Sequence, residues 1–253
     1  TQVSEGPPLV GDDAIVTVEA NYYAGGPLPN ADVHWMVSSS PGSFTPPGWD
    51  DFIFGIWKPF WTTFAYEKPY FPGGSPYGQP NRIEEFDGRT GADGAHALRI
   101  DFKSVDPPQP STVRAEATVM DVNRQAWTAS STLLVHPAAL YVGLRTDRTF
   151  VDKGTPILVD AIVVDLDGQV VAGRAITMRA VRLKWVYSQG EWKEEEADEQ
   201  LCTVTSTNKP VRCTFNTPEG GTYRITATIE DLQGRRNQTE LTRWVSGGQR
   251  PSA

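Results

Sequence analysis

The chain has 253 residues, of which 39% are hydrophobic, and it carries a formal net charge of −8 at pH 7. This hydrophobic content excludes a disordered chain, and the negative charge argues against a nucleic-acid partner, whose phosphates need a basic face. No apolar run reaches the roughly 18–20 residues of a membrane-spanning helix. The length predicts two domains.

Short alternating runs rich in Val, Ile, Thr and aromatic residues recur along the chain, and they predict β-strands. No stretch shows a sustained helical period, so we predict an all-β protein. In the first half the runs are 14–23, 32–37, 97–102, 113–120 and 126–135, and in the second half they are 157–164, 175–186, 211–215, 222–229 and 236–245.

An aromatic-rich insert interrupts the first half at about residues 41–82 and holds twelve of the chain's 26 aromatic residues. A long loop this apolar must pack on something, either its own sandwich or a neighbouring domain. The alternative is an exposed platform whose rings stack on sugars, as in a carbohydrate-binding or adhesive module. Its candidate interaction surface consists of Trp49, Phe52, Phe54, Trp57, Trp61 and Tyr66.

The two halves of the chain align with each other. Residues 113–121 match 223–231 without gaps, at an offset of 110, and the register continues to Val135 against Val245. Segments that match in the same order and at the same offset indicate a duplicated domain. Units of about 110 residues with some seven strands predict two tandem immunoglobulin-like or fibronectin III-like antiparallel β-sandwiches. We place them at 1–137, including the insert, and at 138–253.

The chain has two cysteines, Cys202 and Cys213. If residues 206–209 form a hairpin loop, the two cysteines fall directly opposite each other. Opposed residues of an antiparallel pair have Cβ atoms about 4.5–5.5 Å apart, which is near the reach of a disulfide. We therefore expect one hairpin disulfide in the second domain, with two reduced core thiols as the alternative. A disulfide implies an oxidising compartment, which is the periplasm, the cell surface or the exterior.

Residue patterns that would carry chemistry are not found. His34, His96 and His136 lack the spacing of metal ligands, and no nucleophile signature occurs. Asp165-Leu-Asp-Gly168 fits a hairpin turn better than a calcium loop, which needs further oxygen ligands. The acidic run 191–199 fits a solvated edge strand, with a docking surface for a basic partner as the alternative. We expect no catalytic, cofactor-binding or metal-binding residues.

Four segments carry a resemblance to a known family. They are Leu134-Val-His-Pro-Ala-Ala-Leu-Tyr-Val-Gly-Leu144, Ile162-Val-Val-Asp-Leu-Asp-Gly-Gln-Val-Val-Ala-Gly173, Thr217-Pro-Glu-Gly-Gly-Thr-Tyr-Arg-Ile-Thr-Ala227 and the insert motif Phe52-Ile-Phe-Gly55. With them, the chain resembles two successive macroglobulin-type domains of a bacterial α2-macroglobulin. The resemblance covers nearly the whole chain.

The resemblance implies a monomeric, non-catalytic scaffold fragment of a large surface-anchored or periplasmic protease trap. In that family a protease cleaves a bait segment, and a Cys-x-Glu-Gln thioester then captures it. Here Glu199-Gln-Leu-Cys202 has those residue types only in reverse order. Residues 243–249 resemble the approach to the bait-region domain, so the bait is expected beyond Ala253. The implied partners are neighbouring domains of the same parent chain and, through the parent, proteases.

Overall fold

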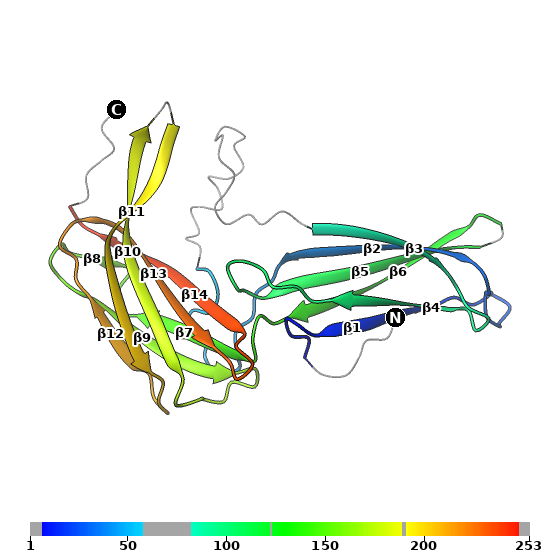
Figure 1. Ribbon diagram of the computed structural model, residues 1–253, viewed down its shortest axis with the longest axis horizontal. Coiled ribbons are helices and arrows are strands. Elements are labelled where there is room, and N and C mark those ends of the chain that lie inside the picture. The colour runs from blue at the N-terminus through cyan, green and yellow to red at the C-terminus, as the bar shows by residue number, and fades with distance from the viewer. Residues whose placement is uncertain (1–6, 58–81, 122, 189–190, 248–253) are drawn as a thin grey trace. The chain divides into compact units, whose positions relative to one another are not determined.

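A computed structural model describes residues 7–57, 82–121, 123–188 and 191–247, in which every regular element is a β-strand (Figure 1). The predicted all-β class is confirmed. The chain divides into two compact units, a first unit of residues 7–43, 82–106 and 110–137 and a second unit of residues 44–57, 107–109 and 138–247. Within the described ranges, no helical segment could span a bilayer.

The first unit packs a four-stranded sheet of order β3-β2-β5-β6 against a two-stranded sheet of β1 and β4. Alternate side chains of these strands form the core, as the period-2 pattern predicts. Trp35 is fully buried in it, and its indole Nε1 donates a hydrogen bond to Nδ1 of His96 at 3.0 Å. The strands are β1 (Asp13–Glu19), β2 (Asp32–Pro41), β3 (Arg82–Arg89), β4 (Ala95–Asp101), β5 (Ser111–Met120) and β6 (Ala126–Val135).

The second unit packs a five-stranded sheet of order β11-β10-β13-β14-β8 against a three-stranded sheet of order β12-β9-β7. Its core is larger, and strand β9 is buried on both faces, which explains the nearly continuous apolar run there. The strands are β7 (Leu140–Thr146), β8 (Phe150–Val151), β9 (Ile157–Asp165), β10 (Ala175–Ser188), β11 (Glu191–Thr205), β12 (Val211–Phe215), β13 (Gly221–Glu230) and β14 (Arg236–Val245).

The internal repeat seen in the sequence is a repeat of topology. Strands β13 and β14 begin 110 residues after β5 and β6, and each pair forms an antiparallel hairpin. In both units this hairpin lies next to a long strand, β2 or β10, which in turn pairs with β3 or β11. Strand β1 with its partner β4 corresponds to β9 with its partner β12. The two units therefore share an arrangement of six strands.

The turns that end β5 and β13 also match. The carboxylate of Asp121 accepts hydrogen bonds from the backbone N–H groups of Asn123 and Gln125 at 2.8 Å each. Asp231 accepts the equivalent bonds from Gln233 at 2.9 Å and Arg235 at 3.0 Å. This local bonding explains why aspartate favours turns. The same side-chain pattern recurs at Asp165, so the segment 165–168 is a hairpin turn, as predicted.

The described part of the aromatic insert, residues 44–57, belongs to the second unit by its contacts. It lies in the connection between β2 and β3, which are both strands of the first unit. The chain passes from the first unit to the second between residues 137 and 138, and the described part of the insert is grouped with the second unit as well. The physical reason is that the apolar side chains of this segment complete a hydrophobic cluster on the three-stranded sheet of the second unit.

Candidate functional site

Residues 44–57 are bonded through their main chain to both sheets of the second unit. Ile53 forms a β-bridge with Leu144 of β7, with N–O distances of 2.8 and 2.9 Å. Ile56 bridges Glu240 of β14, where the N–H of Trp57 donates to the Glu240 carbonyl at 2.9 Å. The segment thus connects β7 of one sheet to β14 of the other, and it forms part of the wall of the sandwich.

Four aromatic side chains of this segment pack on the outer face of β7 and β9, whereas Ile53 and Trp57 pack against the main core. Phe52 is 5% exposed and clusters with Tyr141, Ile162 and Val164. Phe44, Trp49 and Phe54 are partly buried against the same cluster. The rings of Phe44 and Tyr141 lie 5.0 Å apart, and those of Trp49 and Phe52 lie 5.5 Å apart in an edge-to-face arrangement. Such pairs add to the energy of apolar burial.

Two glycines give the segment room to approach the sheet. A Cβ atom on Gly143 would lie 2.6 Å from Cζ of the Phe54 ring, so any larger residue at this position would force the ring to move. A Cβ on Gly168 would lie 2.2 Å from the carbonyl oxygen of Pro47, and Gly168 also has a φ of +81°, which favours glycine. The Trp49 indole Nε1 donates to the Gly168 carbonyl at 2.9 Å, fixing the segment to the turn.

Replacing Gly143 with alanine is therefore expected to destabilise the second unit by about 1–3 kcal/mol, because the added methyl group overpacks the contact with Phe54. The double variant Gly143→Ala/Phe54→Ala is expected to lose less than the two single losses added together, because the contact with Phe54 is then removed and only the 3.1 Å approach to Ile162 remains. Urea denaturation of the four proteins measures the coupling. Additive losses would mean that Phe54 does not rest on Gly143.

Four of the six candidate interaction residues are thus packed side chains. Trp57 contacts the Trp244 ring edge-to-face at 5.9 Å, and the guanidinium of Arg243 lies 5.4 Å from the centre of its ring. Trp61 and Tyr66 lie outside the described residues. Phe52 is buried, whereas Trp49, Phe54 and Trp57 are partly buried, and an interaction surface at these residues stays a prediction.

An ion-pair network borders the cluster. Arg145 forms an ion pair with Asp51 of the insert segment. Its guanidinium carbon also lies 4.5 Å from the centre of the Phe52 ring, so the same side chain contacts the aromatic cluster. Asp160, which is 8% exposed, accepts two hydrogen bonds from Arg212 at 2.6 and 3.0 Å. These bonds lower the pKa of the Asp160 carboxyl, and they outweigh the opposing effect of its burial.

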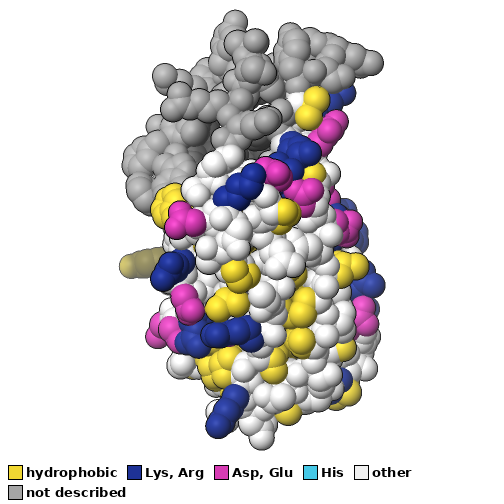
Figure 2. Space-filling view, turned by 90° about the vertical axis from the view of Figure 1, so that its left-hand side faces the viewer, with side chains coloured by type: hydrophobic (Ala, Val, Ile, Leu, Met, Phe, Trp, Pro, Cys, Tyr) yellow, Lys and Arg dark blue, Asp and Glu magenta, His cyan; other side chains and the backbone are white. Residues whose placement is uncertain are grey.

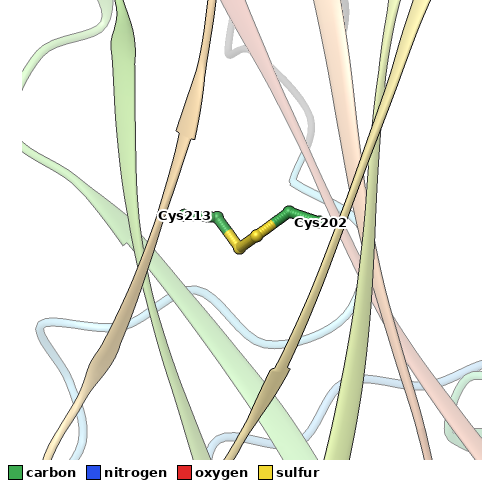
Figure 3. Close-up of a disulfide and its surroundings, with 2 residues drawn as sticks. All are labelled: Cys202 and Cys213. Atoms are coloured by element: carbon green, nitrogen blue, oxygen red, sulfur yellow. A yellow bond between two sulfur atoms is a disulfide. The ribbon is translucent and has the colours of Figure 1, made fainter.

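The Cys202–Cys213 disulfide is present, with a Cα–Cα distance of 6.3 Å (Figure 3). The predicted hairpin between the two cysteines is wrong. Strand β11 belongs to the five-stranded sheet and β12 to the three-stranded sheet, so residues 206–210 cross from one sheet to the other. Ser206 is buried there, and its hydroxyl donates to the Val171 carbonyl at 2.8 Å. The disulfide therefore ties the edges of the two sheets together.

Replacing both cysteines with alanine is expected to lower the free energy of unfolding by about 3 kcal/mol, because the unfolded chain regains the freedom of a loop of about 12 residues. Guanidinium denaturation measures this loss. A reductant is expected to lower the stability of the unaltered protein to that of the variant and to leave the variant unchanged. Equal stability of both proteins without reductant would contradict a structural role for the bond.

Many charged side chains of the second unit form ion pairs with one another. The acidic run on β11 faces arginines of neighbouring strands: Arg179 pairs with Glu196 at 2.5 Å and with Glu199 at 2.7 Å, and Arg182 pairs with Asp198 at 2.5 Å. Figure 2 shows basic and acidic side chains interspersed on one face, with hydrophobic side chains scattered between them. Such a mixed surface lacks the single-sign field that steers a charged partner.

The three histidines are spread through the first unit. His34 contacts Asp87 at 2.8 Å on the exposed face of β2, and that hydrogen bond raises the pKa of the imidazole. His96 accepts the bond from Trp35, and burial lowers the pKa of His136. Over the described ranges, no three His, Cys, Asp or Glu side chains converge as metal ligands would.

Comparison with known proteins shows the fold. No family model matches the chain. The curated "Circularly permutated Ras protein 2" of Dictyostelium discoideum is 26% identical over 163 residues, which is 60% of this chain and 4% of that protein. The shared segment is therefore a small part of a much longer protein, and nothing of that protein's activity follows for this chain.

Solved structures of bacterial α2-macroglobulins cover nearly the whole chain. The native Escherichia coli protein matches 99% of it with a TM-score of 0.60 and 16% identity, and the trypsin-activated form matches 99% with 0.62 and 16%. The Salmonella protein reacted with methylamine matches 98% with 0.57 and 15%. The chain spans 17%, 16% and 16% of these proteins. It therefore has the fold of one stretch of a bacterial α2-macroglobulin.

Proposed function

We propose that this chain is a non-catalytic scaffold segment of a bacterial α2-macroglobulin-like protease inhibitor. Its two sandwich units hold neighbouring parts of a longer polypeptide in place. The bait and the thioester of such a protease trap lie elsewhere in that polypeptide. Proteases are then partners of the whole molecule, and neighbouring domains are the direct partners of this segment.

The observation that carries this proposal is the match to two states of one protein. Both native and trypsin-activated E. coli α2-macroglobulin align with 99% of this chain, at similar TM-scores of 0.60 and 0.62. A segment that resembles both forms to the same degree is one whose fold is kept when the trap is activated, which is the behaviour of a scaffold.

The chemistry of the described residues supports the same proposal. The charged side chains on β10 and β11 form ion pairs, and the described insert aromatics pack on a sheet. Both serve the stability of the fold. The disulfide supports an extracytoplasmic location, because such bonds persist in oxidising compartments. A periplasmic or cell-surface protease inhibitor works in such a compartment.

Incubation of the isolated 253-residue chain with trypsin tests the proposal. We expect full trypsin activity on a protein substrate, and we expect no covalent conjugate of chain and protease on a denaturing gel. The longer polypeptide that contains this chain is expected to inhibit the same digestion. Stoichiometric inhibition by the isolated chain would overturn the scaffold proposal, and so would a longer polypeptide that inhibits no protease.

A further inference from the structure

A cavity of about 100 Å³ lies between the two sheets of the first unit, at the end of the sandwich where β2 ends and β5 begins. Its apolar lining belongs to the core of this unit. Val37, Val113 and Val135 of the larger sheet contribute to it, and so does Phe102, which directly follows β4. Each of these four side chains is at most 8% exposed. The cavity is therefore a gap in the core packing.

The second unit carries a phenol ring at the equivalent position. At the offset of 110 residues, Val113 of β5 corresponds to Tyr223 of β13. Val113 lies opposite Ser39 of β2, and Tyr223 lies opposite Arg182 of β10. Tyr223 is completely buried, and its hydroxyl donates to the carbonyl of Glu219 at 2.8 Å. The first unit has the smaller valine at this position, and the cavity lies beside that valine.

The size of the cavity limits a ligand to one ring. An apolar cavity of about 150 Å³ takes one benzene molecule, whereas pockets for drug-sized ligands measure about 300 Å³ or more. At about 100 Å³, this cavity has room for a single ring and none for a second.

The polar lining favours an uncharged ligand with a hydroxyl group. Two basic and two acidic residues line the cavity, and they are Arg82, Lys103, Glu84 and Asp101. Arg82 pairs with Glu84 at 2.7 Å, and Asp101 pairs with Arg99 at 3.0 Å, so the lining has no net charge to offer an ion. Three serines also line the cavity: Ser39, Ser104 and Ser111. A serine hydroxyl can donate to a ligand hydroxyl or accept from it.

We propose that this cavity binds a free monocyclic phenol. The ring packs on Val37, Val113 and Val135 of the first unit, at the position that corresponds to the Tyr223 ring of the second unit. Its hydroxyl bonds to a serine of the lining. The ligand thus replaces, without a covalent bond, the aromatic ring that β13 supplies from its own sequence. All of the lining residues belong to the first unit, so the site does not depend on the scaffold role.

Titration of the full chain with p-cresol, which is the side chain of tyrosine as a free molecule, tests this proposal. Two-dimensional NMR is expected to show saturable shifts of the Val37, Val113 and Val135 signals, and contacts between the ring protons and the methyl groups of these valines. The Kd is expected to be on the order of 1 mM, because little more than one ring is buried.

Two further ligands define the chemical class. p-Xylene has the shape of p-cresol with a methyl group in place of the hydroxyl, and it is expected to bind less tightly because it cannot bond to a serine. N-acetyl-tyrosinamide carries the same phenol on a peptide unit. It is expected to bind at least about tenfold more weakly, because the cavity has no room for its amide groups. Tighter binding of p-xylene would overturn the assignment to phenols, and tighter binding of N-acetyl-tyrosinamide would overturn a free ligand.

Three variants locate the site. Val113→Phe supplies a ring from β5 itself, and Ser111→Phe fills the same space from a half-buried position. Each is expected to weaken p-cresol binding at least about tenfold. Arg114→Phe places the same ring on the opposite face of β5, and it is expected to bind p-cresol as the unaltered chain does. The proposal is overturned if p-cresol gives no saturable shifts, if the shifts lie away from this cavity, or if either filled variant keeps its fold and binds as tightly as Arg114→Phe.

Discussion

Replacing Phe52 with alanine is expected to lower the free energy of unfolding of the second unit by about 3–5 kcal/mol, although this residue lies in a connection between two strands of the first unit. The side chain is 5% exposed and packs on Tyr141, Ile162 and Val164. Its removal leaves a cavity over the outer face of the three-stranded sheet. It also removes the ring that lies under the guanidinium of Arg145.

Phe150 provides the matched control, since it belongs to the same unit but is 67% exposed. Phe150→Ala is expected to cost less than about 1 kcal/mol, the usual range for a surface substitution. Urea denaturation measures both variants, and hydrogen exchange in β7 and β9 shows which unit loses stability. A small loss for Phe52→Ala, or loosening confined to the first unit, would contradict the assignment of residues 44–57 to the second unit.

Asp231→Ala is the second substitution with a large expected effect, about 3–5 kcal/mol, because it leaves several buried donors without an acceptor. The carboxylate side chain is 1% exposed and accepts a 2.7 Å ion-pair bond from Arg235. The same oxygen, Oδ2, also accepts a hydrogen bond at 3.1 Å from the N–H of Ala139, which directly precedes β7. The turn after β13 is thereby joined to the opposite sheet.

The matching turn of the first unit supplies the control. Asp121 accepts the same two backbone hydrogen bonds as Asp231. The ion pair with Arg235 is the additional contact of Asp231. Asp121→Ala is therefore expected to cost about 1 kcal/mol, the typical net value of a hydrogen-bonded turn side chain. Similar losses for the two variants in thermal or urea denaturation would contradict the special role of Asp231.

The same carboxylate makes stability depend on pH. Burial raises the pKa of Asp231, but the bonds from Ala139 and Arg235 outweigh it, so the folded-state pKa lies below the ordinary value of 3.8. Asp231 therefore stabilises the fold above about pH 4, and this contribution is lost as the pH falls through the lower folded-state value. Asp231→Asn is expected to flatten the fall in stability between about pH 5 and pH 3. If the free energy of unfolding of the variant fell as steeply with decreasing pH as that of the unaltered chain, the role of Asp231 would be contradicted.

The strands and the internal repeat could be predicted from the sequence, because each of them depends on a local pattern of residues. Alternation predicts β5, β6, β13 and β14 closely, and the turn aspartates Asp121, Asp165 and Asp231 bond to their own neighbours in the chain. Each of these signals arises within a few residues. A duplicated unit then shows the same signals twice, at the same offset.

The partners of these elements could not be predicted in the same way. The alternation around Cys202 and Cys213 is that of a hairpin, but Ser206 is bonded to Val171, and the chain crosses between sheets instead of turning back within one. The aromatic insert was expected to pack on something, but which unit supports it is shown only by contacts such as the approach of Phe54 to Gly143 and the bridge between Ile53 and Leu144. Which sheet a strand joins, and which unit the insert packs on, depend on contacts between residues far apart in the chain.

Mapping where a protease attacks the longer polypeptide tests the scaffold proposal most directly. After brief exposure to trypsin, mass spectrometry of the peptides identifies the first bond cleaved and any residue joined covalently to the protease. We predict that both positions lie outside residues 1–253, and that the strands of the two units stay protected from cleavage. A first cleavage or a covalent attachment site within this segment would contradict its role as a non-catalytic scaffold.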